Sequence, residues 1–354
     1  MVELNKYIFV LLLAIGTYFF NKYFLLVLAK TKFGLLDDNQ FQKPQAFHEK
    51  STFRSGGITI FFQSIILFIY LWFSEKIFFP EYASFCTLFF LLGLMDDIKI
   101  KISQSLRLFL MSISLILLVI FNEFYVERTG LTFLNNLIQN NQIFSIIFVC
   151  LCFLFVINGS NLVDGFNGLL GIHALIITLI LVPINILNEN SNFAYILFCV
   201  GIIIMIFLMF NFPKAQMFLG DSGAYLIGSF VSISVIKTST LTPSISPFFF
   251  CILLVYLFFE AFFSFCRKRF IEKQHPLHPD NKHMHMLLYK FFVSKNKSKE
   301  ESNYTVSVYI NFIYFLLVLP AFFFMDNGIF CKYYFLFLIL VYFYFYKMLY
   351  KKVK

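Results

Sequence analysis

Residues 142–187 have the sequence QIFSIIFVCLCFLFVINGSNLVDGFNGLLGIHALIITLILVPINIL, and this stretch decides the fold class. Its two apolar runs, 142–158 and 168–187, are close to the length that an α-helix needs to cross the hydrocarbon core of a membrane. The segment between them is rich in Asn, Asp and Gly and contains no Lys or Arg. Because long apolar runs separated by short polar segments are typical of membrane spans, this stretch predicts two transmembrane helices joined by a polar loop.

The same alternation continues along the whole chain of 354 residues. Hydrophobic residues make up 60% of the chain and charged residues 13%, whereas about a quarter of the residues in a soluble domain are charged. We therefore expect an all-α, polytopic membrane protein with ten or eleven transmembrane helices in a single domain, 1–354. The first apolar run is long and lacks a small-residue cleavage site, so we expect a span rather than a cleaved signal peptide. The eleven candidate spans are 7–29, 56–73, 81–95, 104–121, 142–158, 168–187, 193–210, 222–240, 247–266, 305–325 and 329–349.

The distribution of basic residues predicts which way the chain crosses the membrane. Of the 28 Lys and Arg residues, 22 lie in or beside the loops of one side or in the C-terminal tail, and five lie on the other side. Such an excess marks the cytoplasmic side, so we expect the N-terminus outside and the C-terminus in the cytoplasm. The net charge of +9 then matches an anionic membrane surface and does not call for nucleic acid as a partner. The segment 122–141 is expected to be a loop or a partly buried hairpin. The cytoplasmic loops are expected at about 30–55, 96–103, 159–167, 211–221 and 267–304.

Two acidic motifs stand at the ends of spans. Asp96 and Asp97 end the third span, where adjacent carboxylates are costly unless a cation or a water-filled cavity receives them. The loop that contains Asn161, Asp164 and Asn167 has more Asn, Asp and Gly than a turn needs, and these side chains can bind Mg²⁺ or phosphate. The alternatives are a solvated helix end for the first motif and an ordinary turn for the second.

Three further motifs lie on the same predicted face. Asp221, between two Gly residues, either caps the following helix or faces a ligand. The segment 275–285 holds four of the six His residues, lacks the Cys or carboxylate partners of a zinc site, and follows Arg267 and Arg269. It is either a basic surface that binds pyrophosphate or a solvated basic loop. Arg54, before a Gly pair, either grips a phosphate or flanks a span. One shared site is the simplest explanation for so many polar motifs on one face.

In their order and spacing these motifs resemble the polyprenyl-phosphate N-acetylhexosamine-1-phosphate transferases, also called glycosyltransferase family 4. The resemblance covers roughly residues 48–288 and rests on four pieces. The His segment favours the branch that transfers GlcNAc-1-phosphate to undecaprenyl phosphate over the phospho-MurNAc-pentapeptide translocase. The chain departs from that branch at Met286, where the branch has another His, and at Asn167, where it often has Asp. The four pieces are Asp96-Asp97, Asn158–Leu169, Gly220–Gly223 and Pro276–His285.

The resemblance implies an enzyme of the bacterial plasma membrane with its active site on the cytoplasmic face. It would transfer a sugar 1-phosphate from a UDP-N-acetylhexosamine to polyprenyl phosphate and release UMP, the first step in making a surface polysaccharide such as O-antigen or teichoic acid. The cofactor implied is Mg²⁺, with Mn²⁺ as an alternative, and a homodimer is left open. The competing class is a transporter, but transporters place such carboxylates near the midplane of the membrane.

The resemblance also implies a role for each motif residue. Asp221 and Asn161 are the expected metal ligands. Asp96 or Asp97 would act on the lipid phosphate, and Asp164 would contact the metal or the nucleotide. The remaining expected substrate-binding residues are Asn167, His283, His285, Arg267, Arg269 and Arg54, together with Asn161 in a second role.

Overall fold

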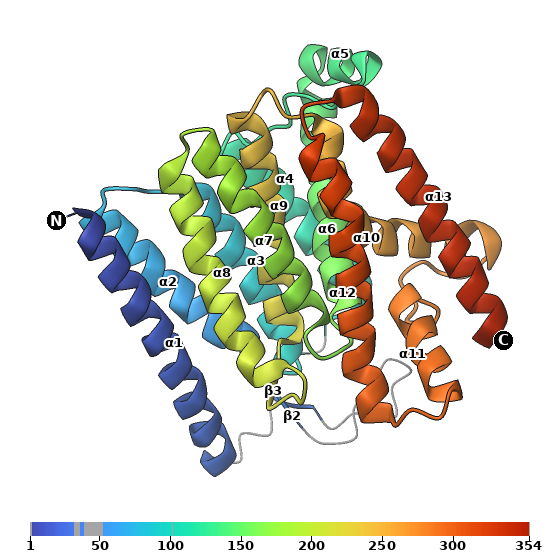
Figure 1. Cartoon of the computed structure of the whole chain (residues 1–354), viewed down its shortest axis with the longest axis horizontal. Coiled ribbons are helices and arrows are strands. Elements are labelled where there is room, and N and C mark those ends of the chain that lie inside the picture. The colour runs from blue at the N-terminus through green and yellow to red at the C-terminus, as the bar shows by residue number, and fades with distance from the viewer. Residues whose placement is uncertain (1, 32–35, 39–51, 101, 354) are drawn as a thin grey trace.

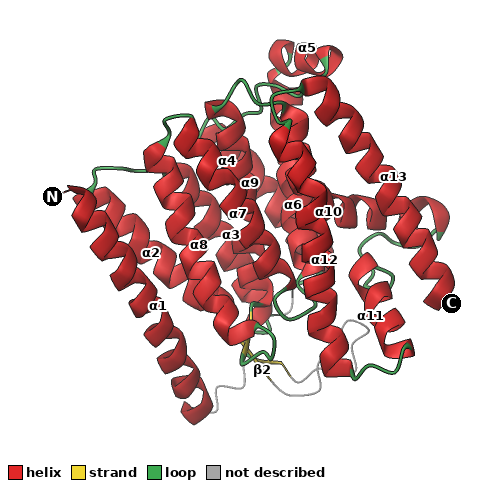
Figure 2. Cartoon of the chain, in the orientation of Figure 1, coloured by secondary structure: helices red, strands yellow, loops and turns green. Residues whose placement is uncertain are grey.

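A bundle of long helices forms the protein, as the computed structural model shows for residues 2–31, 36–38, 52–100 and 102–353 (Figure 1). Ten helices in these ranges are long and apolar enough to cross a membrane, so the predicted all-α, polytopic class is confirmed. Figure 2 shows how little of the described chain is not helical. The helices are α1 (Val2–Thr31), α2 (Gly56–Ser74), α3 (Pro80–Asp97), α4 (Gln104–Phe121), α5 (Thr132–Asn140), α6 (Gln142–Val163), α7 (Leu169–Leu187), α8 (Ser191–Asn211), α9 (Gly220–Leu241), α10 (Pro247–Cys266) with the π-helix η1 (Arg267–Ile271), α11 (Met284–Ser294), α12 (Lys299–Phe323) and α13 (Gly328–Val353).

Helix α9 lies at the centre of the bundle and packs antiparallel along α3. The Tyr82 hydroxyl lies 2.8 Å from the Ser234 hydroxyl near one end of this pair, and Lys237 bonds Glu81 beside it. At the other end Gly93 allows close approach, because an added Cβ would lie only 2.4 Å from the Asp221 carbonyl oxygen. Helix α3 corresponds to the predicted span 81–95. It is an eighteen-residue helix inside the bundle, but its acidic residues keep it out of the ten clearly apolar helices.

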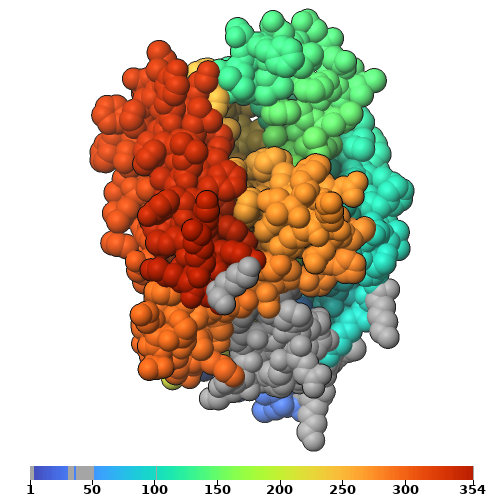
Figure 3. All heavy atoms as spheres, turned by 90° about the vertical axis from the view of Figure 1, so that its right-hand side faces the viewer, coloured from blue at the N-terminus to red at the C-terminus, as the bar shows by residue number. Residues whose placement is uncertain are grey.

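Outer helices cover this centre. Helices α1 and α13 lie at opposite edges of the bundle and expose most of their side chains, which suits contact with lipid (Figure 1). Figure 3 shows α13 beside α11 on the face near the C-terminus. The predicted segment 122–141 is neither a hairpin nor only a loop. It ends in the short, mostly exposed helix α5, at the end of the bundle opposite β2 and β3.

Two of the predicted loops contain helical residues. Helix α6 continues to Val163 instead of ending before 159–167, and the Asp164 N–H still donates to the Ser160 carbonyl at 3.1 Å. The segment 267–304 contains η1, α11 and the first turn of α12, where the Ser298 side chain accepts a bond from the Glu301 N–H. Most of the predicted loop 30–55 lies outside the described residues.

Three very short strands, which the sequence does not predict, add a small sheet to the helices. They are β1 (Asp37–Asp38), β2 (Thr52–Arg54) and β3 (Met217–Phe218). Strand β2 pairs antiparallel with β1 and parallel with β3, so that Arg54 lies opposite Phe218. The Gly57 N–H also donates to the Leu219 carbonyl at 2.8 Å. The sheet therefore holds Arg54 next to the start of α9.

Candidate active site

The acidic motifs, the Asn-rich loop after α6 and Arg54 meet at the end of the bundle where β2 and β3 lie, opposite α5 (Figure 1). A pocket with an empty volume of about 580 Å³ opens there. Its lining combines charged and amide side chains with backbone of the Gly-rich turns. The lining residues are Arg54, Asp164, Gly165, Phe166, Asn167, Asn211, Phe218, Leu219, Gly220, Asp221 and Asn303.

Asp97 holds the start of helix α9. Its side chain is buried, and its two carboxylate oxygens accept hydrogen bonds from the backbone N–H groups of Asp221 and Ser222, each at 2.9 Å. A carboxylate at a helix N-terminus satisfies N–H groups that have no partner within the helix and interacts well with the helix dipole. Gly220 has a φ of +78°, and an added Cβ there would lie 2.6 Å from the Asp97 carboxylate. The turn before α9 is therefore built around this side chain.

Asp221 lies between two guanidinium groups. Its carboxylate is 3.5 Å from Arg107 Nη1 and 3.9 Å from Arg54 Nη1, and the Asn161 side-chain N–H donates to it at 3.1 Å. Arg107 also bonds Asp96 directly and so links the two acids. All four of these charged side chains remain partly exposed. The site thus presents two carboxylates and two cations to the pocket and the solvent beside it.

The loop between α6 and α7 forms another wall of the pocket. Burial, followed by the negative charges of Asp221 and Asp97, raises the pKa of Asp164 well above its usual range. The Asn167 side chain donates to the Pro213 carbonyl at 2.9 Å, a bond that an Asp at this position would lose. Phe166 packs its ring edge to face against His285, with ring centroids 5.6 Å apart.

Only the end of the His segment folds into a buried network, and none of the segment lines the pocket. His283 and His285 are buried, whereas His275 and His278 are exposed. His283 lies between two carboxylates, with its Nδ1 2.9 Å from Glu260 and its Nε2 3.5 Å from Asp280. Burial would raise the pKa of the Asp280 carboxyl, but His283, Arg267 and Lys268 together hold it below its usual value.

Burial lowers the pKa of His285 to about 4, so this side chain is neutral at physiological pH. Arg267 is buried and bonds Asp280 at 2.7 Å and Glu272 at 3.0 Å, whereas Arg269 is exposed. The expected substrate contacts of His283, His285, Arg267 and Arg269 stay predictions.

The side-chain oxygen atoms beside the pocket are of the type that binds Mg²⁺. Carboxylate and amide oxygens from Asp96, Asp221 and Asn161 are hard ligands of the type that Mg²⁺ prefers. Across the described ranges no three His, Cys, Asp or Glu side chains converge as a complete metal cage. Mg²⁺ commonly binds through one or two carboxylates while water and substrate phosphates supply its other ligands, so a nucleotide site does not require such a cage.

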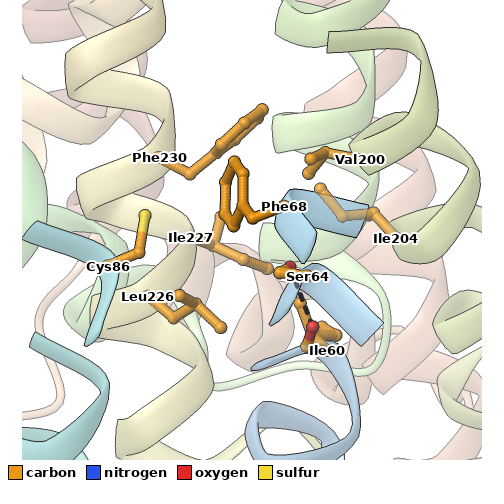
Figure 4. Close-up of a pocket in the computed structure, with 9 residues that line it drawn as sticks. All are labelled: Ile60, Ser64, Phe68, Cys86, Val200, Ile204, Leu226, Ile227 and Phe230. Atoms are coloured by element: carbon orange, nitrogen blue, oxygen red, sulfur yellow. Dashed lines mark hydrogen bonds between the residues drawn. The ribbon is translucent and has the colours of Figure 1, made fainter. Parts of the chain in front are cut away.

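A second cavity lies in the apolar interior and has a different character (Figure 4). Nine residues of α2, α3, α8 and α9 line it, and only Ser64 and Cys86 carry a polar or sulfur atom in the side chain. The Ser64 hydroxyl is already bonded to the Ile60 carbonyl at 2.9 Å. With no charged group in its wall, this cavity offers nothing to a phosphate or a metal.

Three site residues are missed by the sequence interpretation. Arg107 counted only as a basic flank of a span, although it joins Asp96 to Asp221. Asn211 and Asn303 line the pocket from α8 and α12, and neither belongs to a recognisable motif. Arg107, eleven residues after Asp96, could have been considered as a partner of the acidic pair from the sequence. The two Asn residues stand in no motif that would indicate a site.

Comparison with known proteins agrees with this geometry. The sequence model of "Glycosyl transferase family 4" matches residues 80–239. A phospho-N-acetylmuramoyl-pentapeptide-transferase of Dictyoglomus turgidum is 32% identical over 240 residues, which cover 66% of this chain and 75% of that protein. The chain belongs to glycosyl transferase family 4. The family that the motifs resemble is thereby confirmed, and its named relatives are transferases and not transporters.

Other relatives in this family are named as N-acetylglucosaminyl 1-phosphate transferases. An undecaprenyl-phosphate alpha-N-acetylglucosaminyl 1-phosphate transferase of Thermotoga maritima is 28% identical over 250 residues, 70% of this chain and 69% of that protein. A probable undecaprenyl-phosphate N-acetylglucosaminyl 1-phosphate transferase of Bacillus subtilis is 26% identical over 273 residues, 75% of this chain and 73% of that protein. The family 4 match contains all the acidic site residues, whereas the His segment and Asn303 lie beyond it.

Proposed function

We propose that the protein transfers GlcNAc-1-phosphate from UDP-GlcNAc to polyprenyl phosphate and releases UMP. The observation that carries this proposal is the convergence of Arg54, Arg107 and Asn161 on Asp221 at a pocket at the end of a membrane bundle. This placement suits a reaction between a lipid phosphate at the membrane surface and a soluble nucleotide. The basic loops of the same side support a cytoplasmic active site with the N-terminus outside.

The reaction joins two anions, so neutralising their charge is the main task. An oxygen of the lipid phosphate forms a bond to the β-phosphorus, and the bond from that phosphorus to the bridging oxygen breaks. UMP leaves with the electron pair of the broken bond. Asp221 and Asn161 would hold Mg²⁺, or Mn²⁺ in its place, and the bound ion supplies positive charge at the pyrophosphate.

The side chains of the chain itself have separate tasks in this proposal. Asp96 acts on the lipid phosphate, because both oxygens of Asp97 already accept backbone bonds. The Arg107 guanidinium, next to Asp96, supplies a fixed positive charge for the same phosphate. Arg54 and Asp164 face the pocket from β2 and from the α6–α7 loop, where they would orient the nucleotide sugar.

A second candidate is the transfer of phospho-MurNAc-pentapeptide to the same type of lipid. Relatives with that name are 32% and 29% identical to the chain, which favours this activity as the alternative. Against it, Asp280, His283 and His285 match the His segment of the GlcNAc branch.

The test is UMP release by purified protein with Mg²⁺, polyprenyl phosphate and one nucleotide sugar at a time. We expect turnover with UDP-GlcNAc and none with UDP-MurNAc-pentapeptide. Turnover only with UDP-MurNAc-pentapeptide would establish the second candidate, and turnover only with UDP-GalNAc would change the sugar. The absence of UMP with all three would refute the proposed activity.

A further inference from the structure

Three consecutive residues at the entrance to helix α7 are each held by an Asn of another helix. The bonds involve two N–H groups and one carbonyl of the backbone, so they fix the main chain and not a side chain. Two of the three Asn residues come from α12, far along the chain from the loop that they hold. The pairs are Asn303 with Asn167 (2.9 Å), Asn211 with Gly168 (2.6 Å) and Asn311 with Leu169 (3.0 Å).

The loop needs these partners because its own residues cannot supply them. Gly168 precedes α7 in a left-handed conformation and has no side chain with which to cap the helix. The first N–H groups of a helix have no partner within it, and buried backbone groups must find one elsewhere. The oxygen of Asn211 accepts the N–H of Gly168, which directly precedes the helix, and the oxygen of Asn303 accepts the N–H of Asn167 one residue earlier. Helices α8 and α12 therefore fix the backbone that leads into α7.

Helix α12 is itself firmly placed against α7. Asn303 and Asn311 are eight residues apart and therefore lie on the same side of the helix, about 12 Å apart along its axis. The amide nitrogen of Asn311 donates to both Leu169 and Ser307, and its oxygen lies 3.1 Å from Nδ1 of His173. All these polar side chains are buried, so their bonds cannot be exchanged for bonds to water.

We infer that Asn303 is a positioning residue that sets the nucleotide-sugar wall of the pocket, with Asn311 fixing α12 behind it. This inference rests on the proposed function. The loop that Asn303 holds presents Asp164, Gly165 and Phe166 to the pocket. The start of α9, which carries Asp221, is held by Asp97 of α3 and not by this loop. Loosening the loop should therefore weaken binding of the nucleotide sugar more than it slows the chemical step.

The test compares Asn303→Ala with Asn185→Ala. Asn185 is also buried and also bonds another helix, because its side-chain N–H donates to Thr238 at 3.0 Å, but it lies near the other end of α7. We expect Asn303→Ala to raise KM for the nucleotide sugar about tenfold, equivalent to about 1.4 kcal/mol, with kcat within about threefold of the original. Asn185→Ala should lower thermal stability to a similar extent and leave KM unchanged.

Hydrogen exchange measured by mass spectrometry gives a readout that needs no activity. Asn303→Ala should speed exchange in a peptide spanning 162–170, whereas Asn303→Asp, which keeps the accepting oxygen, should leave it slow. Unchanged exchange in Asn303→Ala, or an equal rise of KM in Asn185→Ala, would overturn the inference. A wild-type protein that releases no UMP would refute the proposed function, and the exchange data would still decide the role of Asn303 in holding the loop.

Discussion

Replacing Asp97 by Asn separates a positioning role from a catalytic one. The carboxylate accepts the Asp221 and Ser222 N–H groups at the start of α9, and an amide can accept only one of them. Its NH₂ group would face the second N–H, so one bond is lost and a buried donor remains unpaired. We expect Asp97→Asn to fold into the same bundle with a displaced Asp221.

The magnitude follows from these contacts. A hydrogen bond to a charged group contributes about 1.5–3 kcal/mol, and losing the negative charge at the helix N-terminus costs a further ~1 kcal/mol. Removing the cost of a buried charge offsets part of this loss, which leaves a destabilisation of about 2–3 kcal/mol. That corresponds to a fall in Tm of roughly 5 °C. Because Asp221 moves with the start of α9, kcat/KM should fall at least about a hundredfold.

The assay measures Tm in detergent and UMP release for Asp97→Asn and for Asp96→Asn. Asp96 bonds the side chain of Arg107 and not the start of α9, so its variant should lose activity with Tm within about 1 °C of the wild type. Equal Tm values for the two variants would refute the capping role of Asp97. Wild-type activity in Asp97→Asn would refute its role in positioning Asp221.

Three further predictions concern the turn before α9, the loop carboxyl and the metal. Gly220→Ala should lower the free energy of unfolding by about 2 kcal/mol or more, because the backbone at Gly220 has a positive φ and the added Cβ would clash with Asp97. Thermal unfolding with Gly165→Ala as control checks this, since nothing lies within 4 Å of a Cβ there. Asp164→Asn, measured in EDTA, should be more stable than the wild type at pH 8. The difference in stability between the two proteins should become smaller towards pH 5. EDTA should abolish UMP release, and Mg²⁺ or Mn²⁺ should restore it.

The sign of the pH effect follows from the raised pKa of Asp164. The folded protein keeps a proton that the unfolded chain releases above about pH 4. The stability of the wild type therefore falls as the pH rises from about 4 towards the raised pKa of Asp164 in the folded protein. The Asn variant has no such proton and does not lose this stability. A gap that widens at low pH would contradict the raised pKa. Full activity in EDTA would contradict the metal, and an unchanged Tm in Gly220→Ala would contradict the tight turn.

Much of the fold is predictable because hydropathy alone determines which segments can cross a membrane. The polar motifs fall on one face because the number of spans between them fixes their side. Helix ends are less predictable. Asn158 and Ser160 suggest a turn in the sequence, but in the bundle both lie within α6, and their side chains bond to carbonyls four residues earlier in the same helix.

The separate roles of the site residues could not be predicted from the sequence in the same way. Asp96 and Asp97 are adjacent, and successive residues of a helix point about 100° apart, so only the packing of α3 on α9 shows which one holds the backbone. Arg107 and Asn303 reach the site through contacts between helices that no local pattern records. The His segment has the composition of an exposed basic surface, and His275 and His278 are exposed, but His283 is buried against the carboxylate of Glu260.

The most direct test of the account is UMP release by Asp221→Asn beside the wild type. Both proteins would be purified in the same detergent and given UDP-GlcNAc, polyprenyl phosphate and Mg²⁺. The account predicts steady UMP release by the wild type and a loss of at least about a thousandfold in the variant, with Tm retained. Near-normal release by Asp221→Asn would contradict the central claim that the chemistry takes place at this carboxylate.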